Sequence, residues 1–277
     1  YNITKTLIQA FQTAPSEESF NSLSIIMADL FQYSKMDAEE LNAILSAIFQ
    51  YLSASESTDS MRNHCLRILR SFINNLKKLL VDEEDLQNLF TPLFTALFQM
   101  SQHPPTKAEA FRCWTEFAIN YYPMLEVVAT QLAQGSFLEL AQGENDDETI
   151  INICLFWKSI AECELDKKAE LRIIDQAANI LLPLLFQIST RIPTTSCDNV
   201  EDYFPHIAAA DAMQSIVKAS PEQSAPVLLH LLQEYSGDKE PDHFGVREAA
   251  LNCLNFLIQF SDCSSFLLQS LDLIYIG

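Results

Sequence analysis

The stretch RNHCLRILRSFI, residues 62–73, has apolar side chains at Leu66, Leu69 and Ile73. They come four, seven and eleven places after Arg62, a spacing that puts them on one face of an α-helix. The same pattern occurs six times, at intervals of 43, 45, 43, 56 and 41 residues. The six segments begin at Ser19, Arg62, Lys107, Ile150, His206 and Arg247. A helix that returns at such intervals is typical of an α-solenoid, in which similar helical hairpins stack against one another.

The three positions are apolar in every segment, which predicts that all of these side chains face a core. The residues four places on are Leu23, Leu66, Phe111, Cys154, Ala210 and Leu251. Seven places on they are Ile26, Leu69, Trp114, Trp157, Met213 and Leu254, and eleven places on they are Leu30, Ile73, Ala118, Ala161, Val217 and Ile258.

The segments between these helices predict a second set of helices. We name the helices of the shared pattern B helices and their companions A helices. The companions are expected at residues 37–51, 83–100, 123–141, 168–189, 221–235 and 264–275. Turn-forming residues fill 53–60, 103–106, 143–147 and 236–242, where hairpins must reverse. The sequence therefore predicts an all-α fold of antiparallel A/B hairpins.

Composition supports a helical core and excludes several kinds of site. Hydrophobic residues make up 48% of the chain, and only five glycines occur, none in a phosphate-cradling pattern. Strand-type alternation is missing, and no apolar stretch approaches the roughly 20 residues of a membrane span. We expect one continuous array of about six repeats over residues 1–277, incomplete at both ends because neither end has a polar cap.

The chain is strongly acidic, with 17 Lys and Arg against 37 Asp and Glu and a formal charge of −20. Such a field repels nucleic acid and anionic lipid and attracts basic proteins. An alternative interpretation is that the excess acid only keeps a long solenoid soluble.

No catalytic or metal-binding motif is found. The seven cysteines form no CxxC pair, which is typical of a reduced, intracellular chain. The five histidines have no HExxH spacing, and no serine or cysteine nucleophile motif occurs. We therefore expect neither an enzyme nor a bound cofactor or metal, and an enzyme of helical fold is the least favoured alternative.

Four segments resemble helices of a known family. DHFGVREAALNCL, residues 242–254, is similar to a B helix of a HEAT repeat. AEELNAILSAIFQYL (38–52), NDDETIINICLFWKSIAECELD (145–166), EDYFPHIAAADAMQSIVKA (201–219) and the helix at 242–262 resemble, in this order, helices of the importin β (karyopherin β) family of nuclear import receptors. The resemblance implies a right-handed superhelix of HEAT repeats, covering about the third or fourth to the ninth repeat of such a receptor.

The resemblance also implies a function and its partners. Receptors of this family shuttle between cytoplasm and nucleus. They hold a basic cargo, or an adaptor of the importin α type, on a concave acidic face, bind Phe-Gly nucleoporins on the convex face, and release cargo to RanGTP. Neither nucleic acid nor membrane insertion is expected.

Two sets of site residues follow from the family pattern. The Phe-Gly slot between consecutive A helices corresponds to Leu45, Ser46 and Phe49 on one helix and Leu89, Leu93 and Phe94 on the next. Leucine and phenylalanine at helical spacing are also typical of a core. The segment 86–98 favours a site because its apolar band is wider than one buried stripe requires.

The acidic set faces a basic partner or Ran in the family pattern. On and beside B helices it comprises Asp146, Asp147, Glu148, Glu162, Glu164 and Asp166. The insertion at 191–204 takes the place of the family's acidic loop and adds Asp198, Glu201 and Asp202. A solvated acidic turn is the alternative for each cluster.

Two other binding proteins fit much of this pattern. A transportin-like or export receptor of the same family would share every feature while using other cargo. A HEAT-repeat scaffold subunit, such as that of a protein phosphatase, has more uniform repeats, so the intervals of 41 to 56 residues argue against it.

Overall fold

The computed structural model describes residues 3–13, 16–33, 38–79, 83–142, 146–165, 171–192, 203–235, 237, 240 and 243–260. Over these ranges every regular element is helical, and no strand occurs. No helix among them is long and apolar enough to cross a lipid bilayer. The prediction of an all-α fold is confirmed.

The helices follow the predicted alternation of A and B elements. The B helices are α2 (Glu17–Tyr33), α4 (Asp59–Leu79), α6 (Lys107–Tyr121), α8 (Asp147–Leu165), α10 (Pro205–Ala219) and α12 (Phe244–Phe260). The A helices are α1 (Ile3–Gln12), α3 (Ala38–Ser53), α5 (Glu83–Gln102), α7 (Ala129–Gln142), α9 (Ile173–Ser189) and α11 (Pro221–Tyr235). Short 3-10 helices precede α6 and α7, namely η1 (Pro104–Thr106) and η2 (Tyr122–Val127).

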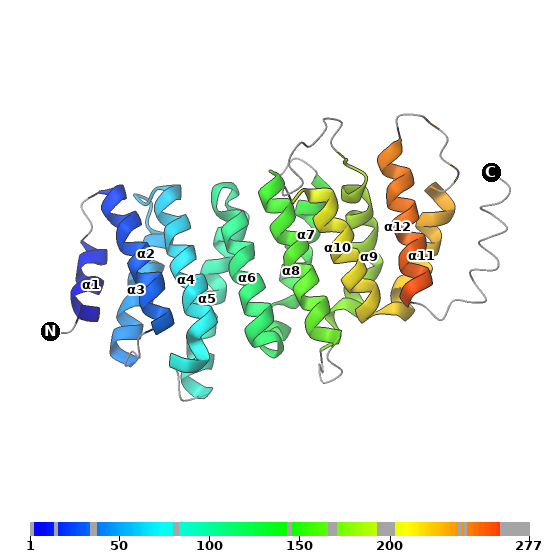
Figure 1. The fold of residues 1–277 in the computed structure, drawn as a ribbon. Coiled ribbons are helices and arrows are strands. Elements are labelled where there is room, and N and C mark those ends of the chain that lie inside the picture. Colours follow the sequence, from blue (N-terminus) through cyan, green and yellow to red (C-terminus); the bar gives the residue numbers. More distant parts are fainter. Residues whose placement is uncertain are drawn as a thin grey trace. The chain divides into compact units, whose positions relative to one another are not determined.

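The chain forms two compact units, residues 1–120 and 121–277. In the first, α2, α4 and α6 form one layer and the A helices lie behind it (Figure 1). In the second, α8, α10 and α12 form a layer in front of α7, α9 and α11 (Figure 1). Each unit is thus a stack of antiparallel hairpins, and one continuous superhelix over residues 1–277 stays a prediction.

The first unit is held together by the predicted stripe of α4 and by an aromatic cluster. Leu66, Leu69 and Ile73 are fully buried. The cluster lies between α5 and α6, where the ring of Phe94 packs edge-on against Phe117 and tilted against Trp114. Burying one such side chain contributes roughly 1.5–3 kcal/mol, so this cluster fixes how the two helices pack.

A hydrogen bond between a B-helix tryptophan and an A-helix serine occurs once in each unit. Trp114 Nε1 donates to Ser101 Oγ at 3.0 Å, and Trp157 Nε1 donates to Ser136 Oγ at 3.0 Å. Both indoles are buried, and each N–H needs a partner once it leaves water. The equivalent contacts show that the two hairpins are built on one plan.

The shared register is correct in the central B helices and wrong in the outer two. In α4, α6, α8 and α10 the predicted positions lie in the core, except that Ala210 is half-buried. In α2 the buried side chains include Ser24 and Met27, each one residue later than the predicted Leu23 and Ile26, and Ile26 is exposed. In α12 they are shifted one residue earlier, so Leu251 and Ile258 are exposed. Both helices contain apolar residues on more than one face, so the spacing alone left two registers possible.

Two A helices begin later than expected, and one A helix was not predicted. The helix expected from residue 123 begins as the 3-10 helix η2, and the α-helical part starts at Ala129. The helix expected from residue 168 begins at Ile173. Helix α1, the A partner of α2, was not predicted. The A helix expected at 264–275 lies outside the described residues.

Candidate functional site

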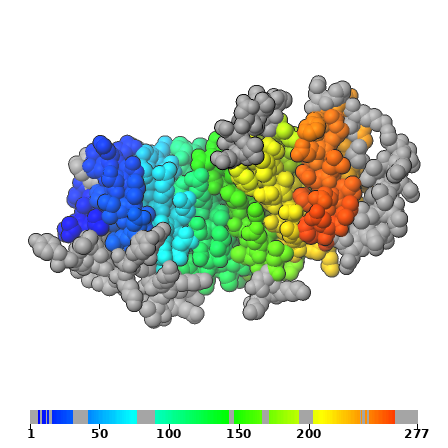
Figure 2. All heavy atoms as spheres, viewed as in Figure 1, coloured from blue at the N-terminus to red at the C-terminus, as the bar shows by residue number. Residues whose placement is uncertain are grey.

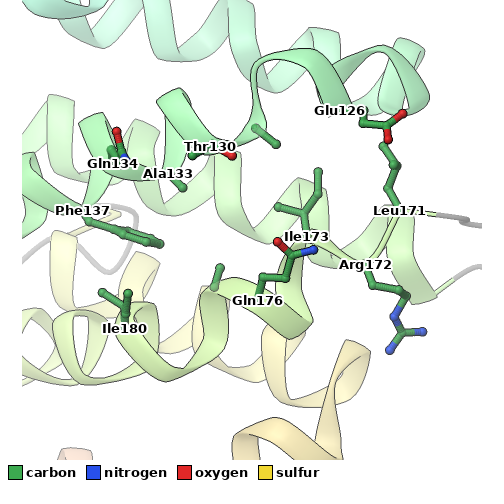
Figure 3. Close-up of a pocket in the computed structure, with 12 residues that line it drawn as sticks. Glu126, Thr130, Ala133, Gln134, Phe137, Leu171, Arg172, Ile173, Gln176 and Ile180 are labelled. Atoms are coloured by element: carbon green, nitrogen blue, oxygen red, sulfur yellow. The ribbon is translucent and has the colours of Figure 1, made fainter.

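A cavity of about 400 Å³ opens between the consecutive A helices α7 and α9 of the second unit (Figure 3). Its lining comes from η2, α7, and the first two turns of α9 with the two residues before them. The residues are Glu126, Ala129, Thr130, Ala133, Gln134, Phe137, Leu171, Arg172, Ile173, Gln176, Ala177 and Ile180. Small side chains on both helices leave the space open, and polar groups lie at its rim.

Aromatic packing fixes one end of the cavity. Phe137 on α7 and Ile180 on α9 lie together at this end (Figure 3). The ring of Phe137 stacks on Trp157 behind it, with centroids 5.4 Å apart and 18° between the planes. The indole N–H of Trp157 in turn donates a hydrogen bond to Ser136 on α7, so this wall of the cavity is held in place without a ligand. Ile180 remains 55% exposed, which makes it an accessible apolar contact.

A buried carboxylate fixes the other end, where α9 begins. Glu164 near the end of α8 accepts the backbone N–H of Ile174 at 3.1 Å and caps the first turn of α9. Its Oε1 also lies 2.5 Å from the hydroxyl of Tyr122 on η2, which is 2.8 Å from the carbonyl of Leu171. Burial raises the pKa of Glu164 above its ordinary value, although hydrogen bonds from Tyr122 and Ile174 act in the opposite direction. These contacts join three helices around the cavity.

The charged rim residue Arg172 is also held in place. Its guanidinium donates two hydrogen bonds to the Asp175 carboxylate, at 2.9 and 3.0 Å. Burial alone would raise the pKa of Asp175, but the hydrogen bonds from Arg172 and Ser220 outweigh it and lower that pKa. Arg172 therefore belongs to an internal network at the start of α9.

The slot predicted between α3 and α5 is largely filled by the protein itself. Leu45, Leu93 and Phe94 are buried in the core, so these three positions have to be corrected. The wide apolar band on α5 has a structural cause, because α6 presents Trp114 and Phe117 to it.

Two residues of the predicted slot stay accessible. Ser46 is exposed and Phe49 is half-buried, both on α3. Leu89 lies in the helical backbone of α5, and its side chain is outside the described residues.

Solved structures with a similar fold were compared with the chain. Yeast importin β, Kap95p, superposes over 97% of this chain with a TM-score of 0.80 at 17% sequence identity. The chain has the importin β fold. A complex of Kap95 with Nup1 matches over 93% of this chain (TM-score 0.75, 17% identity), and Kap121p bound to RanGTP matches over 92% (TM-score 0.62, 15% identity).

The importin β fold is shared over only part of each neighbour. This chain covers 32%, 31% and 28% of the three solved chains. No protein-family model matches the sequence, and a comparison with curated proteins finds no match. The importin β fold also makes the repeat class explicit: the hairpins are HEAT repeats in an α-solenoid.

Within this importin β fold, the acidic residues predicted to bind a basic partner differ in exposure and in hydrogen bonding. Asp147, Glu148 and Glu162 are exposed on α8. Asp146 caps α8, because its carboxylate accepts the N–H of Thr149 at 2.9 Å. Glu164 is buried and bonded inside the protein, so its assignment to a basic partner has to be corrected.

Four further acids of the predicted set, Asp166, Asp198, Glu201 and Asp202, lie outside the described residues. Next to the insertion that holds three of them, the hydroxyl of Tyr203 donates to Asp211 on α10 at 2.9 Å. This bond fixes the point where the insertion returns to α10.

The sequence interpretation missed the cavity between α7 and α9. A signal existed, because small residues occupy Ala129, Ala133 and Ala177. Spacing could not reveal that these positions face one another across two helices. Cys65, Cys113, Cys154 and Cys253 are buried in the helices and are free thiols. In the part of the chain that the structure describes, no group of His, Cys, Asp and Glu is arranged to hold a metal ion.

Proposed function

We propose that this chain is part of a nuclear transport receptor of the importin β type, and that the cavity between α7 and α9 binds the phenylalanine of a Phe-Gly nucleoporin segment. The observation that carries the proposal is this preformed, partly apolar cavity between two consecutive A helices, with Phe137 and Ile180 at one end. A solved neighbour of the same fold is a complex of Kap95 with Nup1, which supports a nucleoporin partner.

The size and lining of the cavity fit one aromatic ring. Burying a phenylalanine contributes roughly 1.5–3 kcal/mol, and part of that is offset by the order imposed on a flexible peptide. A single cavity of this kind gives weak binding and fast release. Repeated Phe-Gly segments then act through several weak contacts at once, as transport through a pore requires.

We also propose a second Phe-Gly slot beside α3, with fewer residues than the family pattern predicts. Ser46 and Phe49 are accessible there, and Leu89 on α5 is retained from the family pattern. Leu45, Leu93 and Phe94 are withdrawn because they support the core.

The acidic residues of α8 are proposed to bind a basic cargo, an importin α-type adaptor or Ran. Asp147, Glu148 and Glu162 are exposed on one B helix in a chain of formal charge −20. Kap121p bound to RanGTP is among the solved neighbours, which supports Ran as a partner. A receptor with these partners shuttles between cytoplasm and nucleus, and its work is recognition without a chemical reaction.

The competing functions are weighed by the same observations. The TM-score is 0.80 for importin β and 0.62 for Kap121p, which favours importin β over other receptors of this type. A HEAT-repeat scaffold has no need of an open cavity between A helices.

The decisive experiment measures binding of a synthetic Phe-Gly peptide to the whole 277-residue chain and to two matched variants. Ile180→Ser removes the exposed apolar contact in the cavity, whereas Leu138→Ser removes a side chain of similar exposure, 57%, that does not line it. We expect weaker binding for the first variant only, and no binding of a Ser-Gly peptide. Equal binding by both variants would remove the cavity from the proposal.

A further inference from the structure

Helix α4 is basic in an otherwise acidic chain. Its 21 residues contain Arg62, Arg67, Arg70, Lys77 and Lys78 against one acid, Asp59. The chain as a whole has more than twice as many acidic as basic residues, 37 against 17. Helix α4 forms one continuous face of the first unit together with α2 and α6 (Figure 2). This local reversal of charge is not explained by the proposed function.

Three arginines of this face converge on one buried carboxylate. Glu109 on α6 has a side chain that is only 5% exposed. Its Oε1 lies 3.0 Å from Nη1 of Arg70, and its Oε2 lies 2.9 Å from Nη1 of Arg112 and 3.8 Å from Nε of Arg67. One buried negative charge thus lies within ion-pair distance of three positive ones, close to Arg70 and Arg112 and more loosely beside Arg67.

All three arginines reach the surface, with Arg112 on α6 34% exposed, and two of them lie side by side on α4. The side chain of Arg67 is 54% exposed and that of Arg70 is 34% exposed, one turn apart on the same side of α4. Two other carboxylates, Glu17 and Glu116, act electrostatically on His64 and Cys113 in this region. Among the described residues, no ion pair joins either of them to Arg67 or Arg70.

We propose that Arg67 and Arg70 form a docking site for an acidic segment of a partner protein, with Glu109 as the buried support that positions them. A guanidinium binds carboxylate groups through two parallel hydrogen bonds, and it loses less freedom when it is already held in place. Arg70 is anchored through Nη1, and Arg67 is held only by the 3.8 Å contact. Both therefore retain donors for an incoming carboxylate.

A protein segment fits this site better than nucleic acid does. Nucleic-acid binding depends on many basic contacts along a phosphate backbone, and a net charge of −20 opposes it. A short acidic segment needs only a local positive site, and repulsion from the rest of the acidic surface disfavours its binding elsewhere. The site is independent of the cavity between α7 and α9, so either can fail without the other.

The test measures the affinity of the full chain for a fluorescent peptide of alternating glutamate and serine, at low and at high salt. The double variant Arg67→Gln, Arg70→Gln is compared with Arg191→Gln, Lys218→Gln, which lowers the net charge equally in the second unit. We expect roughly tenfold weaker binding for the first pair, because two charge-assisted contacts are lost. The control should bind as the unchanged chain does, and salt should weaken all binding.

Three results would overturn the proposal. They are equal affinity of the two double variants, equal binding of a glutamine–serine peptide, and tighter binding of an RNA oligonucleotide that depends on Arg67 and Arg70. If the double variant unfolds, the single variant Arg67→Gln replaces it, because this exposed side chain makes only the 3.8 Å contact with Glu109.

Discussion

Phe137 stacks its ring on that of Trp157, with centroids 5.4 Å apart and 18° between the ring planes. The indole of Trp157 is in turn fixed by its hydrogen bond to Ser136, one residue before Phe137 on α7. The wall of the cavity is therefore an extension of the core, and its shape depends on core contacts.

Ser136→Ala should destabilise the second unit by about 1–3 kcal/mol, because it leaves the buried N–H of Trp157 without its acceptor. Denaturant unfolding measures the change. Ser159→Ala is the control, since the Ser159 hydroxyl donates only to Leu155 within its own helix. Equal losses for the two variants would show that the bond to Trp157 contributes nothing.

Ala133→Leu should block the cavity and weaken binding of a Phe-Gly peptide while leaving stability almost unchanged. Ala133 lines the cavity on α7 and is half-buried, so a larger side chain enters the open space. Titration calorimetry gives the affinity. Gln131→Leu adds an apolar side chain to an exposed position of the same helix outside the cavity, and its binding should not change.

Stability should fall as the pH rises from about 4.5, the ordinary pKa of the Glu164 carboxyl, towards its raised value in the folded protein. The Glu164 carboxyl binds its proton more tightly in the folded than in the unfolded protein. Its contribution to the free energy of unfolding is therefore fully present at low pH and is lost as the carboxyl ionises. The Tyr122 hydroxyl has one proton and two nearby acceptors. A protonated Glu164 resolves this competition, because it can donate to Tyr122 while Tyr122 donates to Leu171.

Glu164→Gln tests this assignment. The glutamine amide can donate to Tyr122 at every pH, so the variant should lack this part of the pH dependence. Thermal unfolding followed as the pH is raised from about 4.5, the ordinary pKa of the carboxyl, measures the difference between the two proteins. Identical pH profiles would contradict the role given to Glu164.

Gly245→Ala should destabilise the packing of α12 on the end of α9. A Cβ at Gly245 would overlap the carbonyl oxygen of Thr190, which belongs to the backbone and cannot rotate away as a side chain can. Gly135→Ala should have the opposite effect on stability, because nothing lies within 4 Å of its added methyl group. Within helix α7 that change should stabilise by roughly 0.5–1 kcal/mol. Chemical denaturation of both variants checks the pair.

The sequence was sufficient to predict the order of the hairpins and most of the core. Leu66, Leu69 and Ile73 follow the helical period and are buried as predicted, because periodic apolar residues can be satisfied only against a neighbouring helix. The helical period predicted burial wrongly at Ile26 and Leu251, which are exposed. Apolar residues on several faces of these two helices allow a neighbouring register, one residue away, to face the core.

The site was predicted less well. Leu93 and Phe94 satisfy the family pattern for a slot, but helix α6 fills that space with aromatic rings. Glu164 was grouped with Glu162 and Asp166 because all three acids lie at or beside the end of one predicted B helix. Its carboxylate instead caps α9, a partner ten residues away that no local pattern identifies.

The sequence by itself determined that this protein is a stack of helical hairpins with an acidic surface, because period and composition are properties of the chain alone. Only the tertiary structure decided which apolar positions stay open: Ile180 remains accessible and Leu93 does not. The physical reason is that a helical pattern marks the face to be buried, whereas the side chains of neighbouring helices determine how completely it is covered.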